Sequence, residues 1–534
     1  MNFRSADATT FARRWSHVMS WTALATIVLA IVAQWDVSSL IDDAYMYARY
    51  ADHFLKYGVV SWNPNGPPAF GATSLLHLGL VIVLRWVGAG TPSIVLLGLS
   101  TAIGVLFLIA HLVLVTVASP ADAERRRIIR LLALLALLPK VASFGSHFTS
   151  GMDTATSMLV LALYLLALVR YETARSTVAL ATAALIGPLI MLVRPDLLVF
   201  SLGIPAAWWL WPAQPGDRAR ATNALAYMAV LTLVTLWAQH RWLGSVLPLP
   251  FWAKTAGVYG QSYSQLYHLV SAQTLVEFLL KSGTPLLAIT TVILAGPKLF
   301  WQRASPTVRG ALVGTVVLMA FYSTSVLPIM DFDARFYHPL LAAFALIAVR
   351  AGTLAFDELH LEQWQVPRAT IRKFSTAGGF LVSAVVVTFS VQQAVALAKF
   401  STSGEVFRTR PEALFLKSLP CWQRPLDLPT AIVFGTTEAG LLASNPERVV
   451  YDLAGINSAE FLASPLDARL IMAKRPDFLV SLHGDYKLQL DRLRADPDFQ
   501  RDYVQVGDMP SSGIDAIRKD SPYFDLLLKT GPCR

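Results

Sequence analysis

Long apolar blocks alternate along this chain with short segments rich in arginine and lysine. Residues 93–118 contain a single acidic or basic side chain, His111, and residues 311–328 and 377–398 contain none. Because a helix needs about 20 mostly apolar residues to cross a bilayer, this pattern predicts a polytopic α-helical membrane protein.

The apolar blocks predict about eleven membrane-spanning helices. We expect the spans near residues 17–39, 93–118, 129–144, 154–170, 177–193, 197–212, 223–241, 284–298, 310–328, 338–356 and 376–398. One further apolar block, residues 74–89, is expected to lie in the outer interface, since it carries His77 and Arg85. Counting it as a span would also place the basic segment 124–130 on the outer side.

Composition and charge indicate the same class of protein. Apolar residues make up 54% of the chain and charged residues 15%, against about 25% charged in ordinary soluble domains. The net charge of +9 comes from basic residues in the interruptions between apolar blocks, which is the positive-inside pattern. We therefore expect no nucleic-acid partner, a cytoplasmic N-terminus and an outer C-terminal region.

Residues 400–534 differ from the transmembrane domain expected at residues 1–399. Charges become more frequent, and the apolar runs shorten to strand length. Strands are predicted at residues 431–435, 449–453 and 477–482, and a helix at 467–475. This alternation predicts a small soluble α/β domain on the extracytoplasmic side.

Two features of this C-terminal region could carry chemistry. The segment "GTTEAG" follows the first predicted strand, but its glycine spacing does not match a phosphate-binding fingerprint, so we expect a plain strand-to-helix turn. Cys421 and Cys533 are the two cysteines of the chain. In an oxidising compartment they are candidates for a disulfide.

Ionisable residues gather in the loops that this topology places outside. The first outer loop, residues 40–73, opens with "LIDDAYMYARY", which contains the adjacent acids Asp42 and Asp43. The other outer loops contain Asp153, Arg194, Lys254, Asp331, Asp333, Arg335 and His338. Ionisable residues at membrane depth mark functional sites by default.

Paired acids beside a membrane fit a metal site, a proton relay or general-base catalysis. A transporter is disfavoured because the charges lie at the ends of the spans and not near the bilayer midplane. Local signatures of zinc sites, phosphate loops and serine hydrolases are absent from the sequence. Arg194, Lys254 and Arg335 suit a phosphate group, and a carboxylate near them could deprotonate a hydroxyl. These parts describe group transfer from a lipid-linked phosphate to an alcohol.

The first outer loop, "DDAYMYARYADHFLKYGVVSWNPNGPPAFGATSLLHL", resembles that of the GT-C superfamily, polytopic glycosyltransferases that use polyprenyl-phosphate sugars. It is most similar to the branch of the mycobacterial terminal arabinofuranosyltransferase. Two departures are Asn65, where that branch usually has glycine, and "FGATSLL", which replaces a Tyr-Thr-Ser-Pro form. Further resemblances follow in the expected order at "TSGMDTA", "VRPD", "LPLPFWAKTAG", "ARFYHPLL" and "VVYDLAGINS".

The resemblance implies inverting transfer of a hexosyl or pentosyl group to a cell-envelope glycan or glycolipid at a bacterial inner membrane. It implies Asp42 as the general base, with Asp43 orienting it, binding acceptor hydroxyls or helping to hold a divalent cation. Such a cation is left open and no cofactor is required. Donor phosphate binding is assigned to Arg194, Lys254 and Arg335. Further substrate contacts are assigned to Tyr45, Arg49, Asp153 and His338.

Structural explanations for these residues stay open beside the catalytic ones. Asp42 and Asp43 could cap a short interfacial helix that begins near Ala44, and Asp153 could cap the span at residue 154. Tyr45, together with Tyr47 and Tyr50, is typical of a membrane interface. The alternative function is a non-catalytic scaffold or binder of lipid-linked glycans with the same fold.

Overall fold

The computed structural model describes most of the helical region and of the C-terminal region. The described residues are 42–90, 97–98, 101, 105, 150–255, 267–281, 283–326, 332–358, 428–482, 486–508 and 514–530. The spans predicted at 17–39, 129–144 and 376–398 lie outside these residues, as does nearly all of 93–118. The predicted count of eleven spans therefore stays a prediction.

The described helical region contains the predicted long apolar helices. Its longer helices are α6 (Thr154–Ala174), α7 (Thr177–Val193), α8 (Leu198–Leu210), α9 (Asp217–Leu243), α11 (Tyr267–Lys281), α12 (Gly283–Ala295), α14 (Pro306–Thr324) and α15 (Leu341–Glu358). Among the described residues, four helices are long and apolar enough to cross a membrane, or up to five if the bent pair α11 and α12 counts as one span. The polytopic helical class is thus confirmed in this coarser form.

The helix boundaries follow ordinary capping chemistry. The Ser176 and Ser305 side chains accept hydrogen bonds from backbone N–H groups in the first turns of α7 and α14. Helix α9 begins after Gly216 and ends at Gly244, both in the left-handed conformation that glycine adopts without strain. The sequence did not predict α11 or the short α13 (Pro297–Arg303).

Two helices follow one another in and after the first outer loop. Helix α2 (Asp42–Tyr57) contains the acid pair in its first turn, and α3 (Leu75–Trp86) has 12 residues. At 1.5 Å per residue α3 is about 18 Å long, which is too short to cross a hydrocarbon core of about 30 Å. Arg85 of α3 pairs with Asp52 of α2 through two hydrogen bonds of 2.7 and 2.6 Å. The structure thus agrees with the non-spanning helix expected at residues 74–89.

The C-terminal region contains a five-stranded sheet. Its strands are β1 (Phe434–Thr436), β2 (Val450–Asp452), β3 (Phe478–Leu482), β4 (Tyr503–Asp508) and β5 (Ile514–Arg518), in the order β2-β1-β3-β5-β4. The first three pair in parallel, and β5 joins β3 and β4 in antiparallel pairs. The three predicted strands are present, whereas β4 and β5 were missed.

Short helices accompany this sheet, and we call residues 428–530 the C-terminal sheet unit. The helices are α19 (Ala439–Leu442), α20 (Ala468–Lys474), α21 (Lys487–Ala495), α22 (Pro497–Asp502) and α23 (Phe524–Thr530). Helix α20 matches the helix predicted at 467–475, and "GTTEAG" forms the predicted turn from β1 to α19. Cys421, Cys533 and the domain boundary expected at residue 400 lie outside the described residues.

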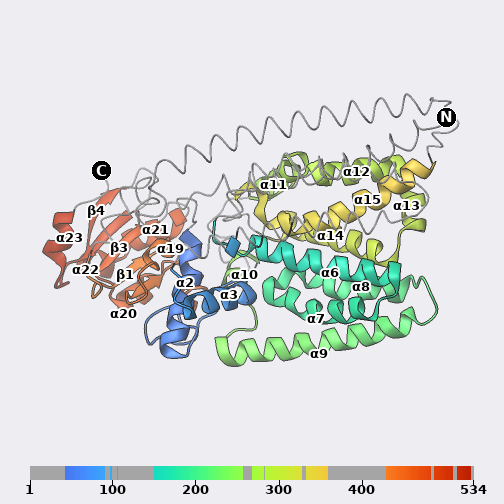
Figure 1. Cartoon of the computed structure of the whole chain (residues 1–534). Helices are drawn as coiled ribbons and strands as arrows, with labels where there is room; N and C mark the ends of the chain where they lie inside the picture. The colour runs from blue at the N-terminus through green and yellow to red at the C-terminus, as the bar shows by residue number, and fades with distance from the viewer. Residues whose placement is uncertain are drawn as a thin grey trace, which may run out of the picture.

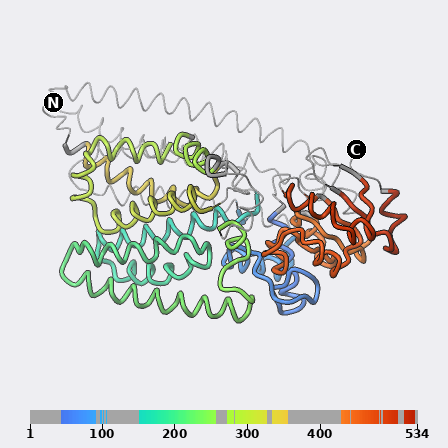
Figure 2. Tube along the Cα trace, turned by 180° about the vertical axis from the view of Figure 1, so that it is seen from behind, coloured from blue at the N-terminus to red at the C-terminus, as the bar shows by residue number. Residues whose placement is uncertain are grey.

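The first outer loop lies between the long helices and the C-terminal sheet unit. Figure 1 shows α2 and α3 (blue) beside the sheet (orange to red) at one end of the helical region, and Figure 2 shows the same neighbourhood from behind. The Trp62 indole N–H donates to the Val450 carbonyl at 2.6 Å, and the Val450 N–H donates to Asn63 Oδ1 at 2.8 Å. Asn65 has φ +53°, a left-handed conformation that asparagine tolerates, so the usual glycine is not required there.

Arg49 is the central residue of this interface. Its side chain is fully buried. It donates to the carbonyls of Trp62, Asn445 and Arg448, and to Asn63 Oδ1 at 3.1 Å. Burial lowers the pKa of Arg49 to about 9, so the guanidinium stays charged at neutral pH. Its donors are directed at three backbone carbonyls and the Asn63 side chain of the protein itself. The predicted contact of Arg49 with substrate stays a prediction.

Replacing Arg49 should loosen the contact between the first outer loop and the sheet unit. The variant Arg49→Met leaves several buried acceptors without a donor, and we expect it to lose on the order of 3 kcal/mol of stability. Thermal unfolding and limited proteolysis of the detergent-purified protein would measure this loss. Lys56→Gln, which breaks an exposed ion pair with Glu447 in the same interface, is the control and should unfold like the wild type. An unchanged unfolding temperature for Arg49→Met would contradict this role.

Candidate functional site

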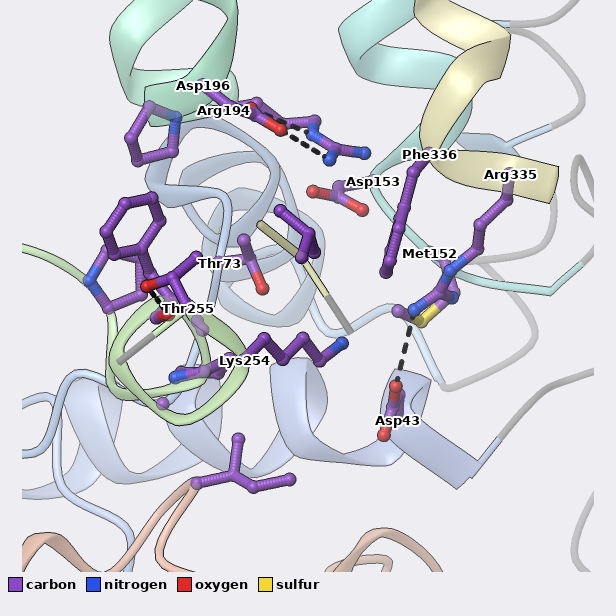
Figure 3. A pocket seen from close by; sticks show the side chains of 18 of the residues that line it. Asp43, Thr73, Met152, Asp153, Arg194, Asp196, Lys254, Thr255, Arg335 and Phe336 are labelled. Carbon is purple, nitrogen blue, oxygen red and sulfur yellow. Dashed lines mark hydrogen bonds and ion pairs between the residues drawn. The ribbon is translucent and has the colours of Figure 1, made fainter. Parts of the chain in front are cut away.

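A cavity lies where the first outer loop meets the ends of several helices. Its volume is about 100 Å³, enough for several water-sized groups at about 10–15 Å³ each. Its polar lining consists of Asp43, Tyr47, Thr73, Asp153, Arg194, Asp196, Lys254, Thr255, Tyr322 and Arg335. Figure 3 labels eight of these side chains, all but the two tyrosines, and shows them converging from segments that lie far apart in the sequence.

Asp43 lies in the first turn of α2 and lines the cavity. Its carboxylate is 3.7 Å from Arg335 Nη2. Burial raises the pKa of Asp43, and nearby Asp153 adds to the rise, while Arg335 and Lys254 offset part of it. A raised pKa makes this carboxylate a stronger base than an ordinary aspartate.

Asp42 was predicted to be the base, with Asp43 as its helper. Helix α2 begins at Asp42, but the Asp42 side chain lies outside the described part of the chain, so its role stays a prediction. The capping explanation expected a short helix beginning near Ala44, whereas α2 begins at Asp42 and has 16 residues, so both acids stand within its first turn. A place in the first turn does not prevent Asp43 from facing the cavity.

Lys254 and Arg335 reach the cavity from two different segments. Lys254 is in the last turn of α10 (Leu249–Thr255), and Arg335 is in the 3-10 helix η3 (Phe332–Leu340). Both cations lie near the ring of Phe336, at 5.0 and 5.7 Å from its centroid, and Figure 3 shows both extending toward Asp43. Arg335 Nη1 is buried and has no hydrogen-bond partner among the described residues. These two predicted phosphate ligands therefore converge beside the carboxylate.

Arg194 also lines the cavity, but a neighbour already uses its charge. Its Nε and Nη2 atoms donate to the two carboxylate oxygens of Asp196, at 3.2 and 2.7 Å. The Tyr322 hydroxyl donates to the same carboxylate. Arg194 is therefore the least available of the three predicted phosphate ligands.

Asp153 stands at the N-cap position of α6 but makes no capping hydrogen bond through its side chain. It is only 6% exposed and lines the cavity, and no hydrogen bond or ion pair to its carboxylate is present among the described residues. The preceding turn is fixed by Gly151, at φ +74°, whose carbonyl accepts from His77 Nε2 at 3.1 Å. Asp153 therefore lines the cavity and does not cap α6 through its side chain.

Two other predicted contacts do not line the cavity. Tyr45 is buried in the core. His338 is buried in η3, with its ring 6.2 Å from that of Phe278. The interface explanation for the tyrosines is also corrected, since Tyr45, Tyr47 and Tyr50 are all buried within the protein.

Several cavity residues were not predicted as site residues. Tyr47 lies four residues after Asp43 on α2 and therefore on the same helix face, so helical spacing could have found it. Asp196 belongs to the quoted "VRPD" segment. Tyr322 lies within a predicted apolar span, and nothing in its sequence neighbourhood marks it. Ile456, from the C-terminal sheet unit, required the tertiary structure.

The cavity contains as many cations as carboxylates, so an anionic ligand depends on where the cations stand and not on net charge. The Arg194–Asp196 pair is neutral as a unit. Lys254 and Arg335 then face Asp43 and Asp153. A phosphate could accept hydrogen bonds from both Lys254 and Arg335. The two carboxylates would then be available to accept hydrogen bonds from hydroxyl groups. No group of three or more potential metal ligands is present within the described ranges.

No family model and no curated protein matches the chain. The chain is similar to two crystal structures of ArnT from Cupriavidus metallidurans, one bound to undecaprenyl phosphate and one in the apo state. The first is 13% identical, with a TM-score of 0.48 and coverage of 96% of this chain and 99% of that one. The second is 14% identical, with a TM-score of 0.49 and coverage of 95% and 98%.

The raised pKa of Asp43 predicts a pH-dependent stability. When a carboxyl group has a higher pKa in the folded state than in the unfolded state, its proton stabilises the folded state. This contribution to the free energy of unfolding is fully present below the ordinary pKa and is lost as pH rises through the raised pKa. The Asp43 carboxyl therefore costs more stability as pH rises from about 4 toward neutral. We expect Asp43→Asn to unfold at a higher temperature than the wild type at neutral pH, with the difference shrinking toward about pH 4.

Thermal unfolding of both proteins across this pH range tests the sign. Asp52→Asn is the control. Asp52 lies on α2, as Asp43 does, but its carboxylate is paired with Arg85 of α3, so this variant should lower the unfolding temperature. A lower unfolding temperature for Asp43→Asn at neutral pH would mean that the attraction to Arg335 and Lys254 outweighs burial.

Proposed function

We propose that this chain is an integral membrane glycosyltransferase that moves a sugar from a polyprenyl-phosphate donor to a hydroxyl of a cell-envelope glycan or glycolipid. The observation that carries the proposal is the convergence of Asp43, Lys254 and Arg335 in one buried cavity. A carboxylate with a raised pKa suits a base, and the two cations suit a phosphate leaving group. The ordered motifs of the first outer loop support the same activity.

In the proposed reaction Asp43 takes the proton from the acceptor hydroxyl. The acceptor oxygen forms a bond to the anomeric carbon as the bond from that carbon to the phosphate oxygen breaks, and the electron pair leaves with the phosphate. Attack from the face opposite the leaving group inverts the anomeric configuration. Lys254 and Arg335 stabilise the charge that develops on the phosphate, so no further acid is required.

Asp153 and the hydroxyls of Thr73 and Thr255 are proposed to bind sugar hydroxyls. Each lines the cavity, and the Asp153 carboxylate has capacity for hydrogen bonds that the described residues do not use. We propose that Arg194 shapes the site through its pair with Asp196. These assignments place the cations of Lys254 and Arg335 on the donor phosphate and the acids on the sugar hydroxyls.

The proposed location follows from the charge pattern and the family resemblance. The chain would lie in a bacterial inner membrane with a cytoplasmic N-terminus. The cavity and the C-terminal sheet unit would then face the outer side, where lipid-linked sugars and envelope acceptors meet. Transfer of an arabinofuranosyl group is the finer form that the loop motifs favour.

A second candidate is a non-catalytic binder of lipid-linked glycans. Lys254 and Arg335 both line the buried cavity. Their charges favour phosphate binding whether or not a reaction follows. The two functions differ in the need for a base, because binding depends on Lys254 and Arg335 and not on a proton acceptor.

Asp43→Asn should separate these two functions. The amide cannot accept the proton, so we expect transfer to fall by about 10²–10⁴-fold. Undecaprenyl phosphate should bind at least as tightly as in the wild type, because the variant removes a negative charge 3.7 Å from Arg335. Transfer would be measured with purified protein and a panel of radiolabelled polyprenyl-phosphate sugars. Asp52→Asn, the same change two turns further along α2, should retain transfer.

Asp42→Asn is run beside these variants. Loss of transfer in Asp42→Asn alone would make Asp42 the base and contradict the role of Asp43. Full transfer in both variants would contradict base catalysis from this helix altogether.

Lys254→Gln and Arg335→Gln should weaken phosphate binding. A hydrogen bond to a charged group is worth about 1.5–3 kcal/mol, so each variant should bind undecaprenyl phosphate about 10- to 100-fold more weakly. Native mass spectrometry or thermophoresis of the full-length protein would measure the affinity. Lys56→Gln removes an exposed lysine from α2 and serves as the control for the loss of a positive charge. Unchanged affinity in both cavity variants would exclude the proposed phosphate site.

A further inference from the structure

The hydroxyl of Tyr50 lies where three segments of the chain meet. Tyr50 is fully buried on α2. Its hydroxyl donates to Asn457 Oδ1 at 3.0 Å and accepts a hydrogen bond from the backbone N–H of Gly71. One hydroxyl thus links α2, the end of the first outer loop and the C-terminal sheet unit.

Asn457 carries this link into the C-terminal sheet unit and back to α2. Its side-chain amide group donates to Asp452 Oδ2 at 2.8 Å and lies 3.0 Å from the sulfur of Met46. Its backbone N–H donates to the same Asp452 oxygen at 2.9 Å. Asn457 is therefore held by the carboxylate that ends β2, and its orientation is fixed.

The residues around this link form part of the cavity wall. Met46, Gly71 and Ile456 all line the cavity. Asp43 lies seven residues, or about two turns, before Tyr50 on α2, so any rotation of the helix at Tyr50 moves the Asp43 carboxylate. The link is thus in a position to set the distance between Asp43 and the cations across the cavity.

Close packing leaves this link little room to adjust. A Cβ atom on Gly71 would lie 2.1 Å from Asn457 Oδ1 and 2.3 Å from the Tyr50 hydroxyl oxygen. Gly455 has φ +82°, and a Cβ there would lie 2.5 Å from the Leu462 backbone. Both glycines stand where the backbone must approach a neighbour closely.

We propose that Tyr50, Gly71 and Asn457 form a positioning junction through which the C-terminal sheet unit sets the geometry of the catalytic cavity. The inference rests on the proposed glycosyl transfer, because it assigns the junction to the placement of Asp43. None of the three residues is assigned a reaction step. They act through α2 and through the cavity wall that Gly71 and Ile456 form.

Tyr50→Phe removes only the hydroxyl and is the main test. Loss of the hydrogen bonds should displace Asp43 and lower kcat about three- to tenfold, with the KM for the donor within about twofold of wild type, because Lys254 and Arg335 are untouched. Gly71→Ala, which keeps both polar partners but forces them apart, should lower kcat in the same way. Glu447→Gln breaks the exposed ion pair with Lys56 across the same interface and should leave kcat unchanged.

Hydrogen exchange supplies a readout that does not depend on activity. In Tyr50→Phe the amides of residues 42–57 and 69–74 should exchange about three- to tenfold faster, while those of α14 should exchange as in the wild type. A merely stabilising role would accelerate exchange in all three segments and leave kcat per folded molecule unchanged.

The outcomes separate the junction from the proposed function. Normal kcat and normal exchange in both Tyr50→Phe and Gly71→Ala would overturn the junction even if the wild type transfers sugar. If the wild type transfers no sugar from any donor of the panel, the proposed function fails. The junction is then decided by hydrogen exchange at residues 42–57 and 69–74 in the two variants, and unchanged exchange there overturns it.

Discussion

The contact of buried Arg49 with backbone carbonyls is the interaction on which the rest of the site depends. Its guanidinium joins Trp62 of the first outer loop to Asn445 and Arg448 of the C-terminal sheet unit. A buried cation is stable only when its donors are satisfied, so α2 and the sheet unit cannot separate without a large cost. Because Asp43 lies on the same helix, this contact also holds the proposed base beside the cations across the cavity.

The two arginines that line the cavity differ in how many hydrogen bonds they can still donate to a ligand. Arg194 donates two hydrogen bonds to Asp196, and the Tyr322 hydroxyl donates to the same carboxylate. This part of the cavity wall is therefore rigid, and its charges neutralise each other. Arg335 is 3.7 Å from Asp43 and keeps a buried nitrogen without a hydrogen-bond partner among the described residues. A ligand anion gains more from the second arrangement, since it satisfies a donor that the protein leaves open. Local pairing therefore distinguishes Arg194, whose donors are used by Asp196, from Arg335, which keeps a buried donor for another partner.

Sequence patterns predicted the elements whose signals are local. The long apolar helices, the non-spanning segment at 74–89 and strands β1 to β3 all follow from hydrophobic runs and charges close in sequence. Strands β4 and β5 were missed because each is short and contains charged residues, which interrupt the alternation of apolar and polar positions. Asp43, Asp153, Lys254 and Arg335 were recognised as candidates because acids and bases stand out against apolar surroundings. Arg49 and His338 were assigned to substrate for the same reason, although neither is among the residues that line the cavity.

By itself, the sequence determined the helical membrane class, the acid pair at the start of the first outer loop and the chemical types needed to hold a phosphate. Only the tertiary structure decided which of those side chains share one cavity, since the contributing segments run from residue 43 to residue 456. It also decided that Ile456 and Asn457 of the sheet unit meet α2 beside that cavity. The physical reason is that apolar periodicity and net charge are properties of neighbouring residues. A carboxylate's base strength and a cation's availability depend instead on burial and on partners that only folding brings within a few ångströms.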